Sequence, residues 1–323
     1  MKTVGPALAE DTPLEARPSK GGSPVLQVLK ERRSALLGLF IVGFFVVLAV
    51  FGPSLAPYSP TQQSGPVYAP PSSEHWLGTD DSGVDVLSEL MYGGRTSMIV
   101  GFTAALVAML VGGGIGLLAG YKGGGTDVAL MRMTDYFLVI PDLVLMIVVA
   151  TVFGPSLSHV ILVIGLLLWT TTARIVRAQV KSIRERVYVR RARSLGASHR
   201  RIVAQHILPQ VAPLLIATTV LTIAYAIFDE SALAFLGVGV PGVSWGTMLE
   251  HAFVRTAMTQ GAWWAFVPPG LSIGLVVIGC YLMGQAIEDA LNPRLRVAHL
   301  SIHSWRFRPT ATAGDERSGE PTT

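Results

Sequence analysis

Three acidic residues lie within stretches of sequence that are otherwise almost entirely apolar. Asp142 directly follows Pro141 in one stretch, and Asp229 and Glu230 are neighbours in another. A carboxylate inside a lipid bilayer costs roughly 3 kcal/mol, so such residues usually have a function or a partner. We interpret all three as candidates for a path that attracts cationic groups. Pairing between helices, or a position near the headgroups, is the alternative.

A second group of residues matches a catalytic pattern. Residues 242–246 (GVSWG) fit G-x-S-x-G, in which some hydrolases present a nucleophilic serine, and His251 follows closely. That chemistry requires a strand–turn–helix context, whereas this pattern lies between two apolar stretches. We therefore predict a turn that leads into a short amphipathic helix over residues 247–258. An intramembrane hydrolase that uses Ser244 is the less favoured alternative.

Acidic residues also crowd a long polar segment, where Glu74, His75, Asp80, Asp81 and Asp85 lie close together. Their spacing fits neither a calcium loop nor a compact histidine ligand set. We expect Asp80 or Asp81 to cap a short helix over residues 84–92. The sequence also lacks the phosphate-binding pattern G-x-x-x-x-G-K-[ST]. We thus predict no catalytic residue, no metal site and no cofactor in this chain, so any ATP chemistry must come from partners.

The composition indicates which elements carry these residues. Half of the 323 residues are hydrophobic, only 14% are charged, and the mean hydropathy is +0.51. An average soluble domain is roughly 25% charged, so we predict an all-α integral membrane protein. A single cysteine, Cys280, excludes a disulfide scaffold. A spanning helix needs about 20 apolar residues, and six stretches qualify: residues 34–51, 96–120, 136–153, 159–176, 211–236 and 266–287. Pro141 predicts a kink in the third.

Lysine and arginine alternate between the two sides of these spans. The connections on one side hold 22 of them, and those on the other side hold one, Arg255. Both termini are therefore expected in the cytoplasm, and the net charge of +4 needs no nucleic-acid partner. The predicted organisation is a cytoplasmic, mostly disordered tail (1–33), a first transmembrane helix with an extracytoplasmic loop (34–94), a five-helix core with a cytoplasmic loop at 177–210 (95–291), and a cytoplasmic tail (292–323).

The cytoplasmic loop is too long for a simple connection between helices. Its alanines and arginines favour a helix over about residues 188–195, and Gly196 is placed to end it. Ser198 can cap a second helix that reaches Ile207, and Pro209 marks the start of the fifth span. The pattern predicts a helix–glycine–helix elbow. A solvated basic loop that binds lipid headgroups is the alternative.

The elbow resembles a known motif. Ala192-x-x-x-Gly196 followed by Ile207-Leu208-Pro209 is similar to the EAA loop of ABC-importer permeases. Several spaced motifs over roughly residues 30–297 resemble the second permease subunit of the dipeptide/oligopeptide/nickel importer family. They are residues 75–80 (HWLGTD) with Gly83 and 85–87 (DVL), 120–121 (GY) with Gly124 and Asp127, 130–132 (LMR) with Asp135, 232–239 (ALAFLGVG), Pro241 with 244–246 (SWG) and 248–249 (ML), and 292–295 (NPRL).

The resemblance implies a six-helix type I importer permease of the bacterial plasma membrane. Its expected partners are a second homologous permease, two ATPase subunits that carry ATP and Mg, membrane lipid, and an extracytoplasmic substrate-binding protein. The expected cargo is a dipeptide or oligopeptide, with nickel chelates, glutathione or another small solute as alternatives. The resemblance makes the elbow a coupling loop (Tyr188, Arg190, Arg191, Ala192, Gly196, Ala197 and Pro209). The intramembrane acids Asp142, Asp229 and Glu230 are the candidates for its translocation path, and the candidates for contact with the binding protein are Trp76, Asp80, Asp81 and Trp245.

Three departures from the family pattern affect these expectations. Arg190 and Arg191 replace the usual Glu-Ala of the loop, which predicts that the facing ATPase groove is acidic. Val84 occupies the place of an arginine before the second span, and Asp142 that of a small polar residue. A secondary transporter driven by an ion gradient is a further alternative, because it too could use intramembrane acids. Such a transporter has no need of a long basic elbow.

Overall fold

The computed structural model describes residues 33–291, so the predictions for the two tails lie outside the described residues. Between these limits the chain forms helices and two isolated β-bridges but no β-strand, as predicted for an all-α protein. Five helical segments are long and apolar enough to cross a membrane. They are α2 (Arg33–Leu55), α3 (Val86–Lys122), α6 (Leu157–Arg184), α9 (Leu208–Phe235) with the short helices that precede it from His199, and α11 (Val267–Leu291) with the turn that precedes it from Trp263.

The remaining predicted span, the third in chain order, is a broken pair of helices, α4 (Gly124–Val139) and α5 (Asp142–Phe153). The two are bent by 86°. Pro141 lacks an N–H group, and a residue that precedes proline is biased toward extended backbone. Ile140 accordingly has φ −82° and ψ 129°. The predicted kink is confirmed, and it is sharp enough to separate the span into two helices.

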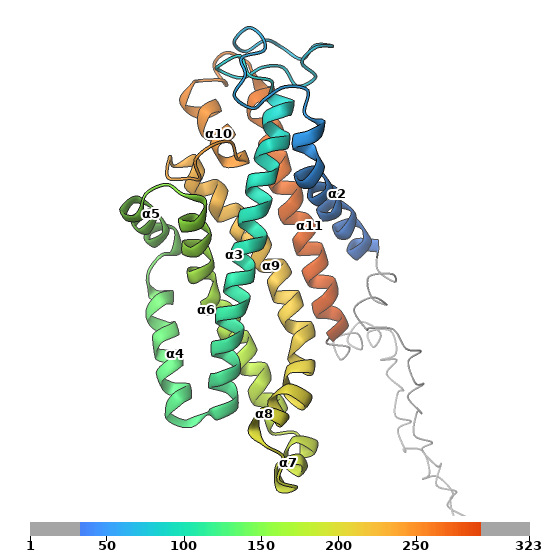
Figure 1. Ribbon diagram of the computed structural model, residues 1–323, viewed down its shortest axis with the longest axis vertical. Helices are drawn as coiled ribbons and strands as arrows, with labels where there is room; N and C mark the ends of the chain where they lie inside the picture. Colours follow the sequence, from blue (N-terminus) through green and yellow to red (C-terminus); the bar gives the residue numbers. More distant parts are fainter. Residues whose placement is uncertain (1–32, 292–323) are drawn as a thin grey trace, which may run out of the picture.

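The helices form an elongated bundle with α3 and α9 in the middle (Figure 1). α2 and α11 pack on one side, and α4, α5 and α6 lie on the other. One end carries α7 (Val187–Ser194), α8 (His199–Ile202) and a π-helical turn, η1 (Val203–Ile207); we call it the elbow end. The opposite loop end carries residues 56–85, α10 (Trp245–Val254) and the 3-10 turn η2 (Trp263–Ala265).

The first long helix of the core begins earlier than predicted. The expected short helix over residues 84–92 and the span over 96–120 are one continuous helix, α3. Asp85, and not Asp80 or Asp81, is its N-cap, and its side chain accepts a hydrogen bond from the Ser88 N–H at 2.8 Å. Asp80 instead closes the preceding turn by accepting from the backbone N–H groups of Ser82 and Val84.

Small residues allow α3 to approach α6 closely. Gly112, Gly116 and Gly120 recur every fourth residue and are buried on one face of α3. A Cβ atom added at Gly116 would lie 2.5 Å from the Ala173 carbonyl oxygen, and one at Gly112 would lie 2.4 Å from that of Trp169. This spacing therefore brings the two helix backbones together, as small residues do between membrane helices.

We predict that Gly116→Ala destabilises the protein by about 1–3 kcal/mol, because the added methyl group must push α6 away. Gly114 lies on the same helix with nothing within 4 Å of an added Cβ. Gly114→Ala should be neutral or stabilise by up to about 1 kcal/mol, since alanine favours helix over glycine. Thermal unfolding of both variants in detergent tests this. Equal melting temperatures would contradict the packing role of Gly116.

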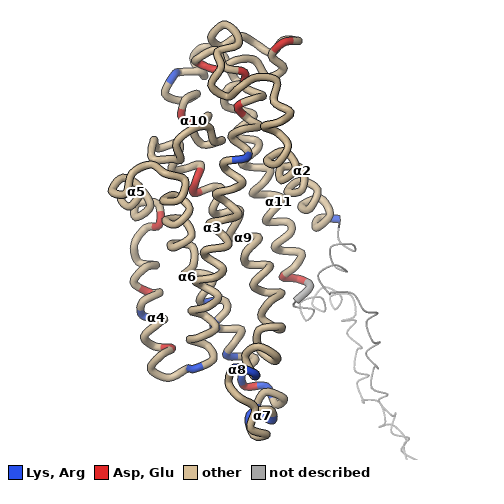
Figure 2. The backbone as a smooth tube through the Cα atoms, in the orientation of Figure 1, with Lys and Arg blue, Asp and Glu red and all other residues tan. Residues whose placement is uncertain are grey.

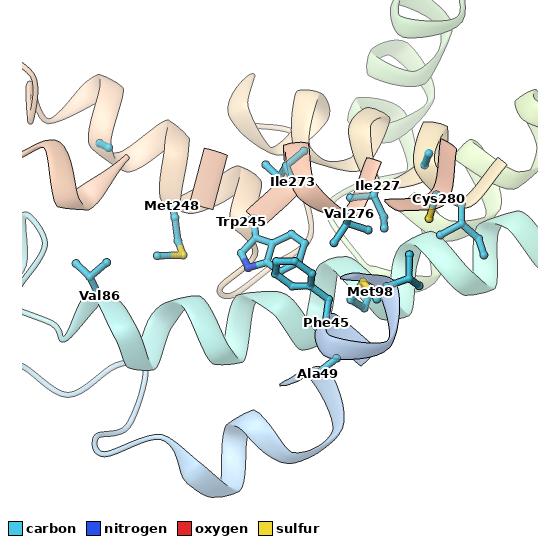
Figure 3. Packing of buried hydrophobic residues seen from close by; sticks show 14 of the residues in the cluster. Phe45, Ala49, Val86, Met98, Ile227, Trp245, Met248, Ile273, Val276 and Cys280 are labelled. Atoms are coloured by element: carbon cyan, nitrogen blue, oxygen red, sulfur yellow. The ribbon is translucent and has the colours of Figure 1, made fainter. Parts of the chain in front are cut away.

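The largest apolar core lies toward the loop end and contains Trp245 (Figure 3). The Trp245 ring is fully buried and packs edge-on against Phe45 of α2, with 5.3 Å between ring centroids. Its indole N–H donates to the Leu90 carbonyl oxygen at 3.1 Å. We correct the expectation that Trp245 contacts a binding protein, because its side chain has no exposed surface. Cys280 belongs to the same core.

Candidate functional site

The elbow, residues 186–207, is held to the bundle by its apolar side chains. Val189 of α7, Ile202 of α8 and Ile207 of η1 are all fully buried. They pack in one cluster with residues of α6 and α9, among them Ile183 and Val211. These three anchors fix one side of the elbow against the bundle. The polar residues between them are consequently turned away from it.

Gly196 forms the bend of the elbow. Its φ of +80° lies in the left-handed region that favours glycine. Its N–H donates to the Arg193 carbonyl oxygen at 3.0 Å, and the Ala197 N–H donates to that of Ala192 at 3.1 Å. These two bonds make a Schellman motif, which satisfies the last carbonyl groups of α7. The predicted role of Gly196 in ending this helix is confirmed, and a Cβ at Gly196 would have nothing within 4 Å.

The second half of the elbow differs from the predicted regular helix. Ser198 caps α8 by accepting from the Arg201 N–H at 3.4 Å, as expected. After four residues the chain widens into η1 and continues directly into α9, which begins at Leu208 with Pro209 in its first turn. Proline removes a helical donor, and the Leu208 N–H bonds to the Val203 carbonyl five residues back. The elbow and the fifth span are therefore continuous.

Polar contacts join the elbow to α9 and α3, and a further bond joins α3 to the end of α6. The Gln210 side-chain amide of α9 donates to the Tyr188 hydroxyl of α7 at 2.5 Å. The Tyr121 hydroxyl, at the end of α3, lies 2.8 Å from His199 Nδ1 of α8. Arg184, the last residue of α6, donates to the Tyr121 carbonyl oxygen at 3.0 Å. A force on the elbow would thus reach α3, α6 and α9 together.

The free face of the elbow is strongly basic. Arg190 and Arg191 are exposed, and Leu195 beside Gly196 is 87% exposed. The segment 177–210 contains one acidic residue, Glu185, which pairs with Arg184 at 3.0 Å. Figure 2 shows the resulting concentration of lysine and arginine at the elbow end. The remaining exposed arginines of the elbow are Arg186, Arg193, Arg200 and Arg201.

The predicted coupling residues occupy two environments. Tyr188, Arg190, Arg191, Gly196 and Pro209 are exposed. Ala192 and Ala197 are half-buried, and Ala197 packs against the apolar cluster under the elbow. The arrangement offers a protruding, rigid and positively charged surface. Such a surface is suited to docking.

Sequence reasoning missed an ion cluster that braces the elbow end. Asp127 of α4 accepts hydrogen bonds from Arg177 at both carboxylate oxygens and from Lys181 Nζ at 2.7 Å. Nearby, Arg174 of α6 bonds to Asp135 of α4 at 2.5 Å. The signal in the sequence was Asp127, an acidic residue at the start of α4, together with Arg177 and Lys181, two basic residues spaced four apart on α6. The cluster links α4 to α6 just before the elbow begins.

The three intramembrane acids do not form one group. Asp142 begins α5 and is exposed, and Asp229 of α9 is half-buried and close enough to interact with it electrostatically. Glu230 is fully buried, and its Oε2 accepts from the Ser97 hydroxyl of α3 at 3.0 Å. Glu230 therefore matches the alternative of bonding between helices and lines no open path here. Asp142 and Asp229 remain the candidates for a path.

At the loop end, the remaining residues predicted to contact a binding protein differ in exposure. Trp76 is 73% exposed, whereas Asp80 is buried and the Asp81 side chain is largely buried. Burial raises the pKa of the Asp80 carboxyl above its ordinary value. Ser244 is buried and caps α10, whose Thr247 N–H donates to its hydroxyl at 3.2 Å. The geometry thus gives Ser244 a capping role, and α10 begins two residues before the predicted helix.

Comparisons with known proteins agree with this geometry. Residues 112–297 match the family model described as the binding-protein-dependent transport system inner membrane component. Residues 24–71 match the N-terminal transmembrane domain of oligopeptide transport permease C. The dipeptide transport system permease protein DppC of Bacillus subtilis is 39% identical over 271 residues, which are 83% of this chain and 84% of that protein.

Two further relatives extend the agreement. The oligopeptide transport system permease protein OppC of Bacillus subtilis is 34% identical over 83% of this chain and 88% of its own length. The di/tripeptide transport system permease protein DppC of Pseudomonas aeruginosa is 36% identical over 84% of this chain and 92% of its own length. The chain belongs to the family of inner-membrane components of binding-protein-dependent transport systems.

Proposed function

We propose that this chain is one of two permease subunits of an ATP-driven importer of dipeptides or oligopeptides. It forms half of the translocation path, and its elbow receives force from an ATPase subunit. The elbow end then lies in the cytoplasm with both termini, and the loop end faces outward. The rule that basic residues stay in the cytoplasm supports this orientation, because they gather at the elbow end (Figure 2).

The single observation that carries the proposal is the construction of the elbow. Three buried anchors and contacts to α3, α6 and α9 hold it rigidly, while its free face is basic and exposed. A rigid surface joined to several spans suits transmission of a domain movement. A secondary transporter has no use for such a surface.

The nature of the cargo rests on the relatives and on two acids. Relatives at 34–39% identity are named as dipeptide or oligopeptide permeases. Asp229 lies close enough to Asp142, where the third span is broken, for the two to interact electrostatically, and neither forms an ion pair with a basic residue among residues 33–291. A cationic amino terminus passing this point would relieve their mutual repulsion. Nickel chelates whose amino groups are bound to the metal fit these acids less well, whereas glutathione keeps a free ammonium group and is not separated from peptides by this feature.

A pull-down from mild detergent tests the proposal. The tagged chain should co-purify with a second permease and with ATPase chains, and the eluate should hydrolyse ATP in a vanadate-sensitive way. Addition of the extracytoplasmic binding protein should stimulate that hydrolysis. If the chain elutes alone and reconstituted vesicles show uptake driven by an ion gradient, the importer proposal is wrong.

A further inference from the structure

A cleft at the loop end lies between residues 60–84, the first turn of α3 and α10. Its volume is about 400 Å³. Asp80, Glu89 and His251 line it, and they also line a smaller adjoining space that Asp81 reaches. Exposed residues such as Thr61 form its rim, so the cleft is open to a molecule that approaches the loop end. We call this site the acidic cleft.

Glu89 is the unusual member of the acidic cleft. Only 7% of its surface is exposed, and its carboxylate has no hydrogen-bond or ion-pair partner within residues 33–291. A buried charge normally has a partner, because its loss of hydration must be compensated. Asp80, Asp81 and Asp85 lie close enough to add electrostatic repulsion. The protein thus keeps a nearly buried carboxyl group that has no partner, and a cation beside it would hold it in its charged form.

The basic groups near these acids do not supply that cation. His75 Nδ1 lies 3.0 Å from Asp85 Oδ1 and is engaged in that pair. Arg255 Nε lies 3.6 Å from an Asp81 oxygen, and its side chain is 67% exposed. His251 is also largely exposed and pairs with Glu250 at 3.5 Å. Asp80 already accepts two backbone hydrogen bonds, whereas Glu89 accepts none. An added cation would therefore form its most favourable ion pair with Glu89.

The geometry favours an organic cation over a bare metal ion. Within the described part of the chain, no three His, Cys, Asp or Glu side chains converge as metal ligands. An ammonium or guanidinium group needs hydrogen-bond acceptors spread around it and no fixed coordination geometry. A lysine or arginine side chain carries such a group on a long flexible stem, which can enter from the rim and reach Glu89.

We propose that the acidic cleft receives a lysine or arginine side chain of the extracytoplasmic binding protein. This inference rests on the proposed function, which places the loop end outside the cell. The inserted cation pairs with Glu89 and relieves the repulsion among the neighbouring acids. Such a pair contributes to both the register and the affinity of docking. The exposed Trp76 belongs to the same outer loop and adds apolar contact area.

The test measures binding of the peptide-free binding protein to the complete importer in nanodiscs. Glu89→Gln should raise the dissociation constant about tenfold at low salt, since it removes a buried charge partner. It should also make the dependence on salt shallower. Glu74 is exposed on the same outer loop but does not line the acidic cleft. Glu74→Gln removes the same charge and should change the constant less than about twofold.

A second variant and a melting-temperature measurement distinguish loss of docking from loss of structure. Glu89→Lys places a cation in the cleft and should abolish docking. Glu89→Gln should keep or raise the melting temperature of the importer, because the amide replaces a nearly buried carboxyl group that has no partner. Equal dissociation constants for the unmodified importer and Glu89→Gln would overturn the inference. So would an effect that appears only with bound peptide, which would identify the peptide amino terminus as the cation. If the unmodified importer binds no such protein, the proposed function itself fails.

Discussion

Replacing Gly196 by tryptophan is expected to reduce ATP-driven uptake at least about 100-fold while the chain still inserts and folds. Gly196 has φ +80° and lies at the exposed bend of the elbow. An added side chain meets no atom of this chain within 4 Å of its Cβ, so the ring projects into the space that an ATPase subunit would occupy. Uptake into reconstituted vesicles, measured beside ATP hydrolysis, shows whether the two activities separate.

Backbone strain must be distinguished from bulk in that experiment. Gly196→Ala imposes the same unfavourable φ, which costs about 1 kcal/mol, but adds little volume. It should retain most of the uptake. Gly237→Trp offers a second control. Gly237 follows the end of α9 at the loop end, has φ +77°, and has open space around an added Cβ. Normal uptake by a well-expressed Gly196→Trp variant would show that the elbow bend does not contact the ATPase.

Reversing the charge of Arg190 and Arg191 should release the ATPase subunits from the membrane complex. Both side chains are exposed on the elbow and replace the acidic and small residues of the usual loop motif. If the facing groove is acidic, the double change to glutamate replaces attraction with repulsion. Loss of two favourable pairs and gain of two like-charge contacts should weaken binding about 100-fold or more. Quantification of ATPase chains that co-purify with the variant measures this effect.

A second double charge reversal at the same end of the protein controls for the effect of net charge alone. Lys122 and Arg132 are exposed near the elbow end but do not belong to the elbow. Reversing both changes the net charge equally and should leave most of the ATPase bound. Lowered salt should strengthen the unmodified complex and weaken the Arg190–Arg191 variant further. If both double variants release the ATPase equally, the contact is not specific to the elbow.

The sequence was most informative where one physical rule dominates. Apolar stretches of about 20 residues located the spans, and Pro141 located the break in the third. Gly196 was identifiable because a helix commonly ends at a left-handed glycine.

Other features depend on contacts between distant parts of the chain and were not readable in advance. Trp245 looks like a surface residue of a loop, yet Phe45 and Leu90 enclose it. Glu230 looks like a path residue, yet Ser97 of another helix bonds to it. The capping role of Asp85 was hidden because several nearby acids were equally plausible. The π-helical turn before α9 depends on how Ile202 and Ile207 are both held against the bundle.

A photo-crosslinker at Leu195 tests the central claim most directly. This side chain is 87% exposed at the tip of the elbow, next to Gly196. In native membranes it should crosslink to an ATP-binding-cassette subunit, and the yield should fall in the Arg190–Arg191 double variant. The same probe at Met258, exposed at the loop end, should not capture that subunit. If Leu195 crosslinks only to lipid while Met258 captures the ATPase, both the proposed coupling role and the orientation of the chain are wrong.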